Sequence, residues 1–559
     1  MKYAITLMMI LMCGVFARAG NPIDENFNYL QADVCVYGAS PAGIMAAVAV
    51  ARDGYSVIII EPVGKIGGLL GSGFRMQQDA PTGEHLGGLT GRYYMKDVAQ
   101  APLKHYQAAS HFNIATLQSF MDPYGDKIKV HVNHRVVSVK KEKGRITEAT
   151  FEFAQADENG VPAPNRTSDD LIVVRAKMFI DASYEGDMMA QAGVTYRVGK
   201  ESKQEYGESL AGTVLGKKFP GVDPYVEKGN PESGLLSCIT PDPLGKEGDA
   251  SRFFMGYNFK LAWEPDPLET AGILITPPDN KNKDLYELLK RYQEAGHKLS
   301  WPEENFNRGE LMTGALPGTQ LGYPDGNWAT RSKIWQSYID HVKTLTDFSG
   351  KTVRFIEGIN EDTNGWPFLY MRGGRRMVGE YVMTQQDIQL QTDPPSPVAM
   401  GYYKIDIYAN RLVVLEDGTL AHEGNVFLLA SPGPYRIPYG ALIPKKAECE
   451  NLIVPLCMSA SHVAYSSIRM ESTYMVMGES AGIAAALALK EKKPVQDINR
   501  KNLTAALQRN GQILEWDGYG YQFGWRSNIF GKPHPETGRW ETHPEEYKKY
   551  PVEVLRKGK

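Results

Sequence analysis

The sequence predicts an α/β protein that contains one discontinuous nucleotide-binding domain. Three observations support this prediction. A short apolar strand at 33–37 runs into a glycine turn, a small-residue helix at about 42–52 and a second strand at 56–60. Strand-like apolar runs return at 177–180 and 451–456, and a long small-residue helix is expected at about 472–490. Strands and helices that alternate in this way indicate a parallel sheet covered by helices.

Length and composition limit the number of domains and the class of protein. The 559 residues allow three or four ordinary domains, or one large domain with a second inserted into it. Hydrophobic residues make up 42% and charged residues 23%, which excludes disorder, collagen and coiled coil as descriptions of the whole chain. The net charge of −4 gives no basic excess, so we expect no nucleic-acid partner.

The first segment has the layout of a secretory signal peptide. Lys2 precedes an apolar run at 5–16, and Ala17-Arg18-Ala19 then forms a small-x-small cleavage site. The run is shorter than the roughly 20 residues that a membrane-spanning helix needs. We therefore expect residues 1–19 to be removed and the protein to be periplasmic or extracellular, with no integral membrane segment afterwards. An uncleaved anchor or a buried first helix is the alternative.

The glycine turn at 38–43 indicates a Rossmann-like site for a dinucleotide. Gly38 permits the tight turn, Gly43 lets the helix approach the strand, and free N–H groups at the start of the helix hold a pyrophosphate. Ser40 replaces the middle glycine and is the smallest substitute with a hydrogen-bond donor. Glu61 ends the second strand, where an acid binds ribose hydroxyls. A purely structural β-α-β unit is the alternative.

The next segments favour FAD over NAD. A glycine-rich loop at 62–73 directly follows the acid and suits a ligand that continues across the backbone; it contains Lys65, Gly67 and Gly68. Two period-two strands at 129–139 and 145–153 are expected to form a meander before the strand at 177–180.

Several segments carry a family resemblance. They are VYGASPAGIMAA, IGGLLGSG, FIDASYEGDMM, YMRGGRRMVGEYVMTQQD, YRIPYGALIPK, NLIVPLCMSASHVAYSSIR and MGESAGIAAALA. With them the chain resembles the FAD-dependent oxidoreductases of the glutathione-reductase-like flavoprotein superfamily from about residue 32 to 490. More narrowly, it is similar to a bacterial secreted group, some members of which carry a xanthan lyase label. It departs from the pattern at Ser40 and at Gly373-Gly374.

The resemblance implies a discontinuous FAD-binding domain with an inserted α+β substrate domain. The parts would be 31–195 and 424–495 for FAD, 196–423 for the substrate, and an aromatic-rich extension at 496–559. The flavin would lie where the two domains meet, near the N-terminal end of the last long helix. The resemblance adds backbone at Val136 near the adenine and further cofactor-binding positions at Ala182, Ser183, Gly186, Ser459 and Gly478.

The candidate catalytic residues are cationic or aromatic. Arg372, Arg375 and Arg376 lie in a segment expected to be helical, in which Arg372 and Arg375 share a face. A histidine can remove a hydroxyl proton while hydride passes to flavin N5. The alternative for each arginine is ordinary pairing at the surface or between domains. The proposed catalytic set is His462, Arg376, Arg469 and Tyr435.

The function expected from this set is oxidation of a small polar substrate, a carbohydrate being one candidate, with an unknown electron acceptor. A carbohydrate lyase and a flavoprotein that only binds are the alternatives. A single glycine fingerprint predicts that NAD(P)H is not the electron donor. FAD is expected to bind noncovalently, a covalent link through His85 being the alternative.

Three further features are expected to be structural. Cys35 and Cys457 lie in apolar runs and are expected in the core. The sequence does not decide whether Cys238 and Cys449 form a disulfide. The histidines show no metal-ligand spacing, so no metal is expected. The aromatic tail after about residue 510 is expected to pack as a strap on the body, stacking on sugar rings being the alternative.

Overall fold

The computed structural model describes most of the chain. The described residues are 26–74, 85–99, 110–261, 263–264, 272–299, 301, 315–427, 431, 433–516, 519–520 and 540–541. The expected signal peptide at 1–19 lies outside these ranges, as does most of the tail beyond residue 516. No helix within the described ranges is long and apolar enough to cross a membrane.

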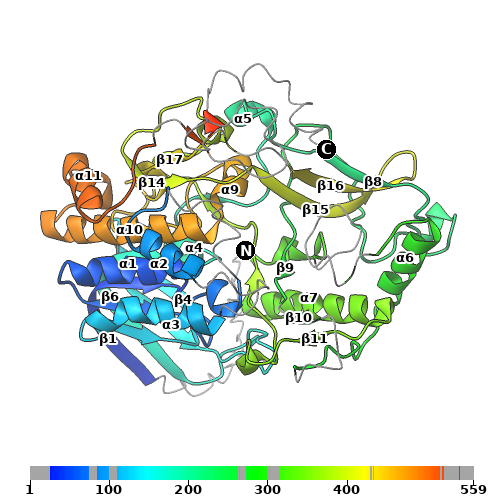
Figure 1. Cartoon of the computed structure of the whole chain (residues 1–559), viewed down its shortest axis with the longest axis horizontal. Coiled ribbons are helices and arrows are strands. Elements are labelled where there is room, and N and C mark those ends of the chain that lie inside the picture. The colour runs from blue at the N-terminus through cyan, green and yellow to red at the C-terminus, as the bar shows by residue number, and fades with distance from the viewer. Residues whose placement is uncertain are drawn as a thin grey trace, which may run out of the picture.

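A seven-stranded sheet forms one half of the molecule (Figure 1). Its strand order is β3-β2-β1-β6-β5-β4, and β18 pairs with β6 beyond the end of β5. The bounds are β1 Asn26–Tyr37, β2 Val57–Ile60, β3 Ile128–His131, β4 His134–Glu142, β5 Arg145–Phe153, β6 Asp170–Asp181 and β18 Leu452–Ile453. The strands β1, β2, β3, β6 and β18 are parallel, whereas β4, β5 and β6 form an antiparallel meander. This arrangement confirms the predicted α/β class.

Helices made of small residues cover this sheet. The helix α1, Pro41–Arg52, packs against α10, Glu471–Glu491, so closely that a Cβ at Gly478 would lie 2.2 Å from the carbonyl oxygen of Ala42. A Cβ at Gly482 would likewise lie 2.3 Å from the Ala46 oxygen. The glycines of α10 therefore set the helix–helix distance. The other helices in this half of the molecule are α2 Gly88–Ala99, α3 Ser110–Met121, α4 Asp187–Gln191 and α11 Arg500–Arg509.

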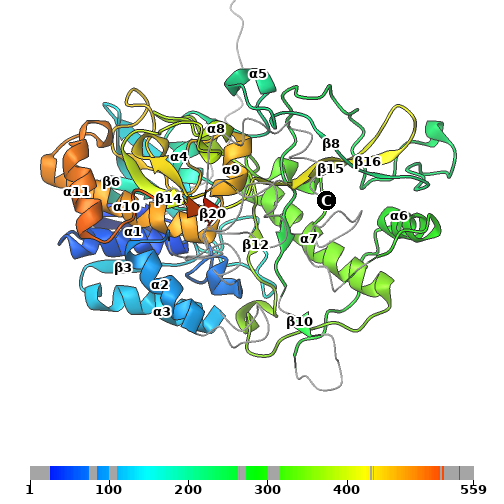
Figure 2. The same ribbon diagram turned by 45° about the horizontal axis from the view of Figure 1, so that its top comes forward.

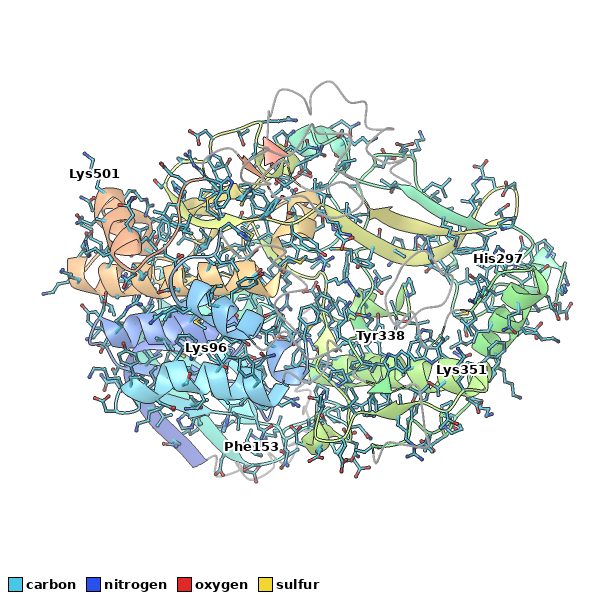
Figure 3. All side chains as sticks on the ribbon, viewed as in Figure 1. Lys96, Phe153, His297, Tyr338, Lys351 and Lys501 are labelled. Atoms are coloured by element: carbon cyan, nitrogen blue, oxygen red, sulfur yellow. The ribbon has the colours of Figure 1, made fainter. Side chains whose placement is uncertain are left out.

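The other half has a long helix and small antiparallel sheets (Figure 2). The helix is α7, Trp328–Ser349, and the largest of these sheets has the order β15-β16-β8. Tyr338 of α7 lies near the middle of this half (Figure 3), where its hydroxyl accepts from the N–H of Tyr257 at 3.2 Å. Aromatic side chains thus form much of the core here.

The remaining elements of the molecule are mostly short. Paired strands are β7 Tyr196–Arg197 with β13 Arg376–Met377, β9 Asn258–Phe259 with β12 Leu369–Tyr370, β10 Trp263–Glu264 with β11 Arg354–Phe355, β14 Pro397–Gly401 with β17 Tyr435–Pro438, and β19 Tyr519–Gly520 with β20 Trp540–Glu541. The three-stranded sheet has β8 Leu215–Phe219, β15 Asp406–Val414 and β16 Leu420–Phe427; the helices are α5 Lys203–Tyr206, α6 Lys283–Glu294, α8 Gln385–Ile388 and α9 His462–Ile468.

The structure corrects three expectations about these elements. The expected strand at 129–139 is two strands: Asn133 adopts φ 58° between them, and β3 pairs with β2 whereas β4 pairs with β5. The run at 451–456 forms only the two-residue β18. The segment that carries Arg372, Arg375 and Arg376 is extended rather than helical, since the Gly373-Gly374 pair disfavours a helix and each arginine has its own distant partner.

A buried ion cluster joins the two halves. Arg331 of α7 donates to both oxygens of Asp187, at 2.6 and 2.7 Å, and Arg375 donates to the same carboxylate at 2.6 Å. Asp187 begins α4 on the sheet side, whereas both arginines come from the other half. Although burial alone would raise it, the two guanidinium groups hold the pKa of Asp187 below its ordinary value.

Candidate functional site

The glycine turn lies at the carboxyl ends of β1 and β6. Gly38 has φ 99°, and a Cβ there would lie 2.5 Å from the carbonyl oxygen of Ala182. A Cβ at Gly43 would lie 2.0 Å from the Gly38 oxygen and 3.2 Å from the Ala182 side chain. The chain at this point is therefore as close to α1 as backbone allows, which is how a dinucleotide fold brings its pyrophosphate to a helix start.

Ser40 has a different role from the one expected of a phosphate donor. Its hydroxyl donates to the Ala182 carbonyl at 2.8 Å and accepts from the Gly43 N–H at 3.2 Å, so it caps α1 and links β1 to β6. Pro41 occupies the first helical position, where its missing N–H costs nothing. Of the other first-turn donors, the Gly43 N–H binds the Ser40 hydroxyl and the Ile44 N–H binds the Ser40 carbonyl at 3.0 Å, so the Ala42 N–H is the one with no carbonyl of α1 to bond.

The acid at the end of β2 is buried at this turn. Glu61 is 5% exposed, and its carboxylate accepts from the N–H of Ala39 at 2.5 Å and of Val63 at 3.0 Å. Burial raises the pKa of Glu61 to about 8; the two N–H groups oppose this rise, and the nearby Glu185 adds to it. The carboxyl group is thus placed beside the glycine turn, where the sequence predicts ribose binding.

The residues after β6 complete the backbone around the turn. Ser183 donates to Asp181 at 2.7 Å and accepts from the Gly186 N–H at 3.0 Å. The Val136 N–H donates to the Tyr37 hydroxyl at 3.3 Å, so β4 is also tied to the end of β1. The expected cofactor positions in 38–43, at 61, at 136 and in 182–186 therefore come together.

The glycine-rich loop is anchored by contacts that the sequence did not predict. The Gly67 N–H donates to the Ala39 carbonyl at 2.8 Å, which fixes the loop against the glycine turn. A Cβ at Gly68 would lie 2.5 Å from the Tyr184 hydroxyl, and that hydroxyl donates to Glu471 at 2.8 Å. Glu471 is the first residue of α10, so the loop and the start of this helix meet at Tyr184.

Three expected cofactor residues have other partners. Lys65 donates to Asn360 and pairs with Asp362, each at 3.1 Å, and so bridges the loop to the other half. Gly478 contacts the backbone of α1, two turns into α10. Ser459 accepts from the Gly379 N–H at 2.9 Å and is fully buried. The structure thus gives these residues packing or bridging contacts.

A cleft of about 430 Å³ opens next to the acid. Val63, Gly64, Lys65 and Asn133 line its sheet side. The remaining lining residues, which include the aromatic side chains of the other half, are 155–158, 160, 362–363, 366–368 and Trp335. Phe368 also contacts Tyr184, with ring centroids 5.4 Å apart, so the cleft reaches the loop and the start of α10.

These features fit a dinucleotide cofactor. The backbone at Gly38 and Gly43 leaves no room for a Cβ, the start of α1 offers the N–H of Ala42, and a buried acid lies beside a cleft of ligand size. A group that extends from Glu61 past the loop would reach the start of α10, where a helix N-terminus favours negative charge.

The expected catalytic residues fall into three places: Arg376 lies with His462, Arg469 donates to the Tyr370 hydroxyl at 2.8 Å, and Tyr435 lies elsewhere. Glu201 joins two of them, because its carboxylate accepts from Arg376 at 2.5 Å and from the His462 N–H at 2.8 Å. Tyr435 lies apart in β17, fully buried, with its hydroxyl 2.8 Å from that of Ser467. The structure therefore brings Arg376 and His462 together and leaves Tyr435 in the core.

His462 is a buried, neutral imidazole. Burial lowers its pKa well below the ordinary value, and the charges of Arg376, Lys200 and Arg469 lower it further. Its Nε2 has no hydrogen-bond partner among the described residues. Burial in the first place, and the three cations in addition, therefore oppose a proton on this ring.

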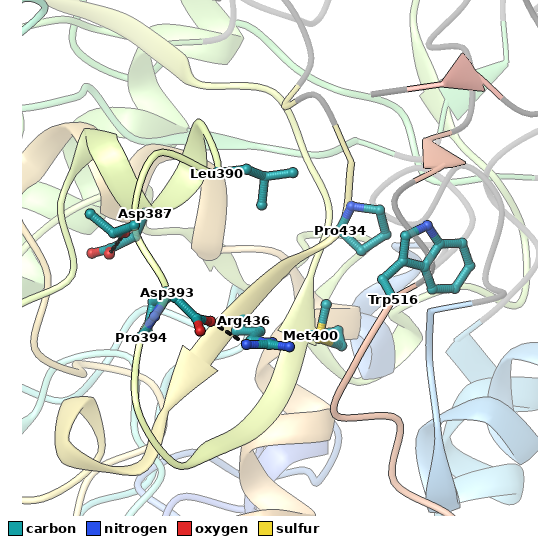
Figure 4. Close-up of a pocket in the computed structure, with 9 residues that line it drawn as sticks. Asp387, Leu390, Asp393, Pro394, Met400, Pro434, Arg436 and Trp516 are labelled. Carbon is teal, nitrogen blue, oxygen red and sulfur yellow. Dashed lines mark hydrogen bonds and ion pairs between the residues drawn. The ribbon is translucent and has the colours of Figure 1, made fainter. Parts of the chain in front are cut away.

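A second pocket lies by the surface near β14 and β17 (Figure 4). Its volume is about 340 Å³, and Arg436 faces it in an ion pair with Asp393. Trp516, from the part of the tail that is described, borders the same pocket. The residues that line this pocket do not include Arg376 or His462.

Other residues singled out in the sequence have clear surroundings. Cys35, Cys238, Cys449 and Cys457 are free thiols, and Cys35 and Cys457 lie in the core as predicted. His85 is 1% exposed and lies edge-on to Tyr402 at 5.6 Å; burial lowers its pKa to about 3.

Sequence reasoning missed several residues of the site. Tyr184 and Asp187 stand in a segment that was quoted for the resemblance, but no role was assigned to them. Glu471 gave no signal, because an acid in the first turn of a helix is ordinarily explained by the helix dipole. Only their contacts across the two halves show what they do.

A family profile matches this chain. The profile describes FAD dependent oxidoreductases and matches residues 33–507. No protein of curated function matches the sequence.

Several solved structures show a weaker likeness over part of the chain. L-proline dehydrogenase from P. horikoshii is 15% identical with a TM-score of 0.18, over 34% of this chain and 27% of that one. Thioredoxin reductase from T. acidophilum is 21% identical with a TM-score of 0.16, over 32% and 40%. THI4 from Thermovibrio ammonificans is 21% identical with a TM-score of 0.21, over 31% and 66%. The chain thus spans less than two thirds of each.

Proposed function

The chain belongs to the FAD dependent oxidoreductase family, and from this premise we propose that it oxidises a small polar substrate, a carbohydrate being the first candidate, by hydride transfer to FAD. The single observation that supports the placement of the cofactor is the cradle of Gly38, Gly43 and Glu61 at the ends of β1 and β2. FAD supplies the hydride acceptor.

The described residues offer a site for each part of the cofactor. Glu61 would bind ribose, the first turn of α1 the pyrophosphate, and the cleft that begins at Val63 the adenosine end. The loop fixed by Tyr184 and the start of α10 would border the flavin. We propose a noncovalent complex, since His85 packs against Tyr402 beside α2.

The substrate would lie on the side of the flavin that faces the other half. Here Glu201 holds Arg376 and the His462 backbone, so the imidazole is fixed in place. With its Nε2 available, His462 would accept the hydroxyl proton of the substrate. A carbohydrate lyase would need no flavin, and the family therefore favours oxidation.

The test is the visible spectrum of the purified protein, followed by anaerobic mixing with candidate donors. We expect about one bound FAD per chain, bleached by a substrate from a panel of mono- and oligosaccharides. NADH and NADPH are expected to leave the flavin oxidised, because the sequence has a single glycine fingerprint and that fingerprint is assigned to FAD. Fast bleaching by NADH or NADPH would contradict the choice of donor.

We also propose that the protein is exported after cleavage near residue 19. N-terminal sequencing of protein from its native cell tests this.

Glu61 is expected to make FAD affinity depend on pH. With a pKa of about 8, the carboxyl group of the cofactor-free protein is protonated at neutral pH. Ribose hydroxyls bind the ionised form more strongly, so FAD binding would release a proton. The dissociation constant should therefore fall as pH rises toward 8, by up to about tenfold per pH unit. Fluorescence titration of the cofactor-free protein with FAD measures it.

The control is Glu61→Gln, which should flatten this pH dependence. The raised pKa of Glu61 also makes the free energy of unfolding depend on pH. Because this pKa is higher in the folded than in the unfolded protein, protonation of Glu61 stabilises the folded state. This contribution is complete below the ordinary glutamate pKa of about 4.3 and is lost as pH rises to 8. An unchanged pH dependence in Glu61→Gln would assign the proton to another group.

A further inference from the structure

Two buried arginines meet on the side of the site that faces the second half. Arg372 follows β12 and is 1% exposed; Arg469, which separates α9 from α10, is 2% exposed. Both guanidinium groups lie over the same two rings: Arg372 is 4.6 Å from the Tyr370 centroid and 4.3 Å from that of Tyr408. For Arg469 the distances are 5.9 and 5.6 Å. The two positive charges are therefore neighbours.

Arg372 keeps one whole edge of its guanidinium group free. Its Nη1 donates to the Gly256 carbonyl at 3.1 Å, whereas Nε and Nη2 have no hydrogen-bond partner in the described part of the chain. These two nitrogens lie on the same edge of the planar group, which matches the spacing of two carboxylate oxygens. Arg469 likewise donates through Nη1 and Nη2 and leaves its Nε without a partner.

The described residues provide little negative charge for this pair. Among the described residues, Asp406 is the one carboxylate within ion-pair distance, 3.8 Å from Nη2 of Arg469. Arg372 has no ion pair with any described carboxylate, unlike Arg331, whose two η nitrogens both donate to Asp187. A buried cation without a counter-ion is costly, so an additional anion is expected at this place.

The pair is connected to the proposed flavin site from two sides. Arg469 stands two residues before Glu471, the first residue of α10. Tyr370 contacts Phe74, which follows the glycine-rich loop, with ring centroids 5.8 Å apart. The chain segment that lines the cleft at 366–368 continues directly into Tyr370 and Arg372. An anion bound here would lie between the loop and the start of the last helix.

We propose that the free edge of Arg372, together with Nε of Arg469, binds a carboxylate group of the substrate. This inference rests on the proposed function and specifies its substrate class: a small organic acid, such as a sugar acid, in place of a neutral sugar. A planar carboxylate accepts two parallel hydrogen bonds from the Arg372 edge, and the rings of Tyr370 and Tyr408 hold that edge in plane.

The same anion would prepare His462 for its role. Arg469 is one of the cations that oppose a proton on this imidazole. A carboxylate between the two arginines neutralises part of their charge, so His462 becomes a stronger base when substrate is bound. The arginines would thereby act both in binding and in making proton transfer depend on the correct substrate.

The test compares matched probes on the FAD-loaded protein. Glucuronate is set against glucose, and acetate against acetamide; binding is followed by the flavin spectrum and by thermal unfolding. We expect each carboxylate to bind at least tenfold more tightly than its neutral partner. Arg372→Met should remove this preference and keep one FAD per chain. Its melting temperature should stay within about 2 °C of wild type, because the change also removes an uncompensated buried charge.

Arg252→Met is the matched control, because its side chain is 67% exposed and pairs with Asp242 at the surface. It should keep the preference. A large drop in the melting temperature of Arg372→Met would show that Arg372 has a structural role. Loss of FAD from this variant would show that the arginine pair binds the flavin cofactor. Either result overturns the proposal. Equal binding of the matched probes, or tighter binding of inorganic phosphate than of acetate, also overturns it. Wild-type protein without flavin would instead contradict the proposed function, since thermal shifts report anion binding without FAD.

Discussion

Replacing Gly43 with alanine is expected to reduce bound FAD at least tenfold. The new Cβ would lie 2.0 Å from the Gly38 carbonyl oxygen and 3.2 Å from Ala182, so α1 must move away from the turn that holds the pyrophosphate. Neither obstacle is a flexible side-chain end: one is backbone and the other is a short alanine. Overpacking of this kind costs about 1–3 kcal/mol even where no ligand is involved. The flavin content of the purified variant, read from its visible absorbance, measures the effect.

Gly125→Ala is the matched control for this substitution. Gly125 has φ −62°, and a Cβ there would lie 3.6 Å from its nearest neighbour, an ordinary contact. This variant should bind FAD as wild type does. Stoichiometric flavin in Gly43→Ala would show that the cofactor does not use the glycine turn.

Removing the carboxylate of Asp187 is expected to lower the free energy of unfolding by about 3–5 kcal/mol. Asp187→Ala leaves Arg331 and Arg375 buried without their shared counter-ion, at the contact between the two halves. Urea unfolding of the FAD-loaded variant and wild type gives the difference. The pKa of Asp187 lies below its ordinary value, so the ion cluster stabilises the fold above about pH 4 and this contribution is lost as pH falls further.

Asp325→Ala is the control that shows how much of the loss in stability depends on the burial of Asp187. Asp325 also binds Arg375, at 3.0 Å, but its side chain is 60% exposed. Solvent therefore screens the pair, and the loss should stay below about 1 kcal/mol. Equal losses in the two variants would show that the buried position of Asp187 contributes nothing.

The parts of the site that local sequence could predict are those in which neighbours in sequence are neighbours in space. The glycine turn, the small-residue helix and Glu61 all lie within 38–61, and the structure places them as expected around the end of β1. Ala182 and Ser183 were predicted by resemblance and lie directly against this turn.

The helix expected at 372–376 is wrong, because contacts between residues far apart in sequence decide the conformation there. Arg372, Arg375 and Arg376 were expected on one helix, but they bond Gly256, Asp187 and Glu201, each more than a hundred residues away. Gly478 was expected at the cofactor and lies on α1, since the approach of two helices is a tertiary property. Tyr435, another member of the catalytic set, has its hydroxyl 2.8 Å from that of Ser467 in the core.

The sequence by itself determined the α/β class, the dinucleotide turn and the acid that follows it, because tight turns and helix starts depend on the residues within a few positions. Only the tertiary structure decided which charges are paired. Arg331 and Arg372 are both buried arginines, yet one faces Asp187 and the other faces no described carboxylate. Pairing depends on which segments meet across the two halves, and a charge buried without a partner is visible only after the chain has folded around it.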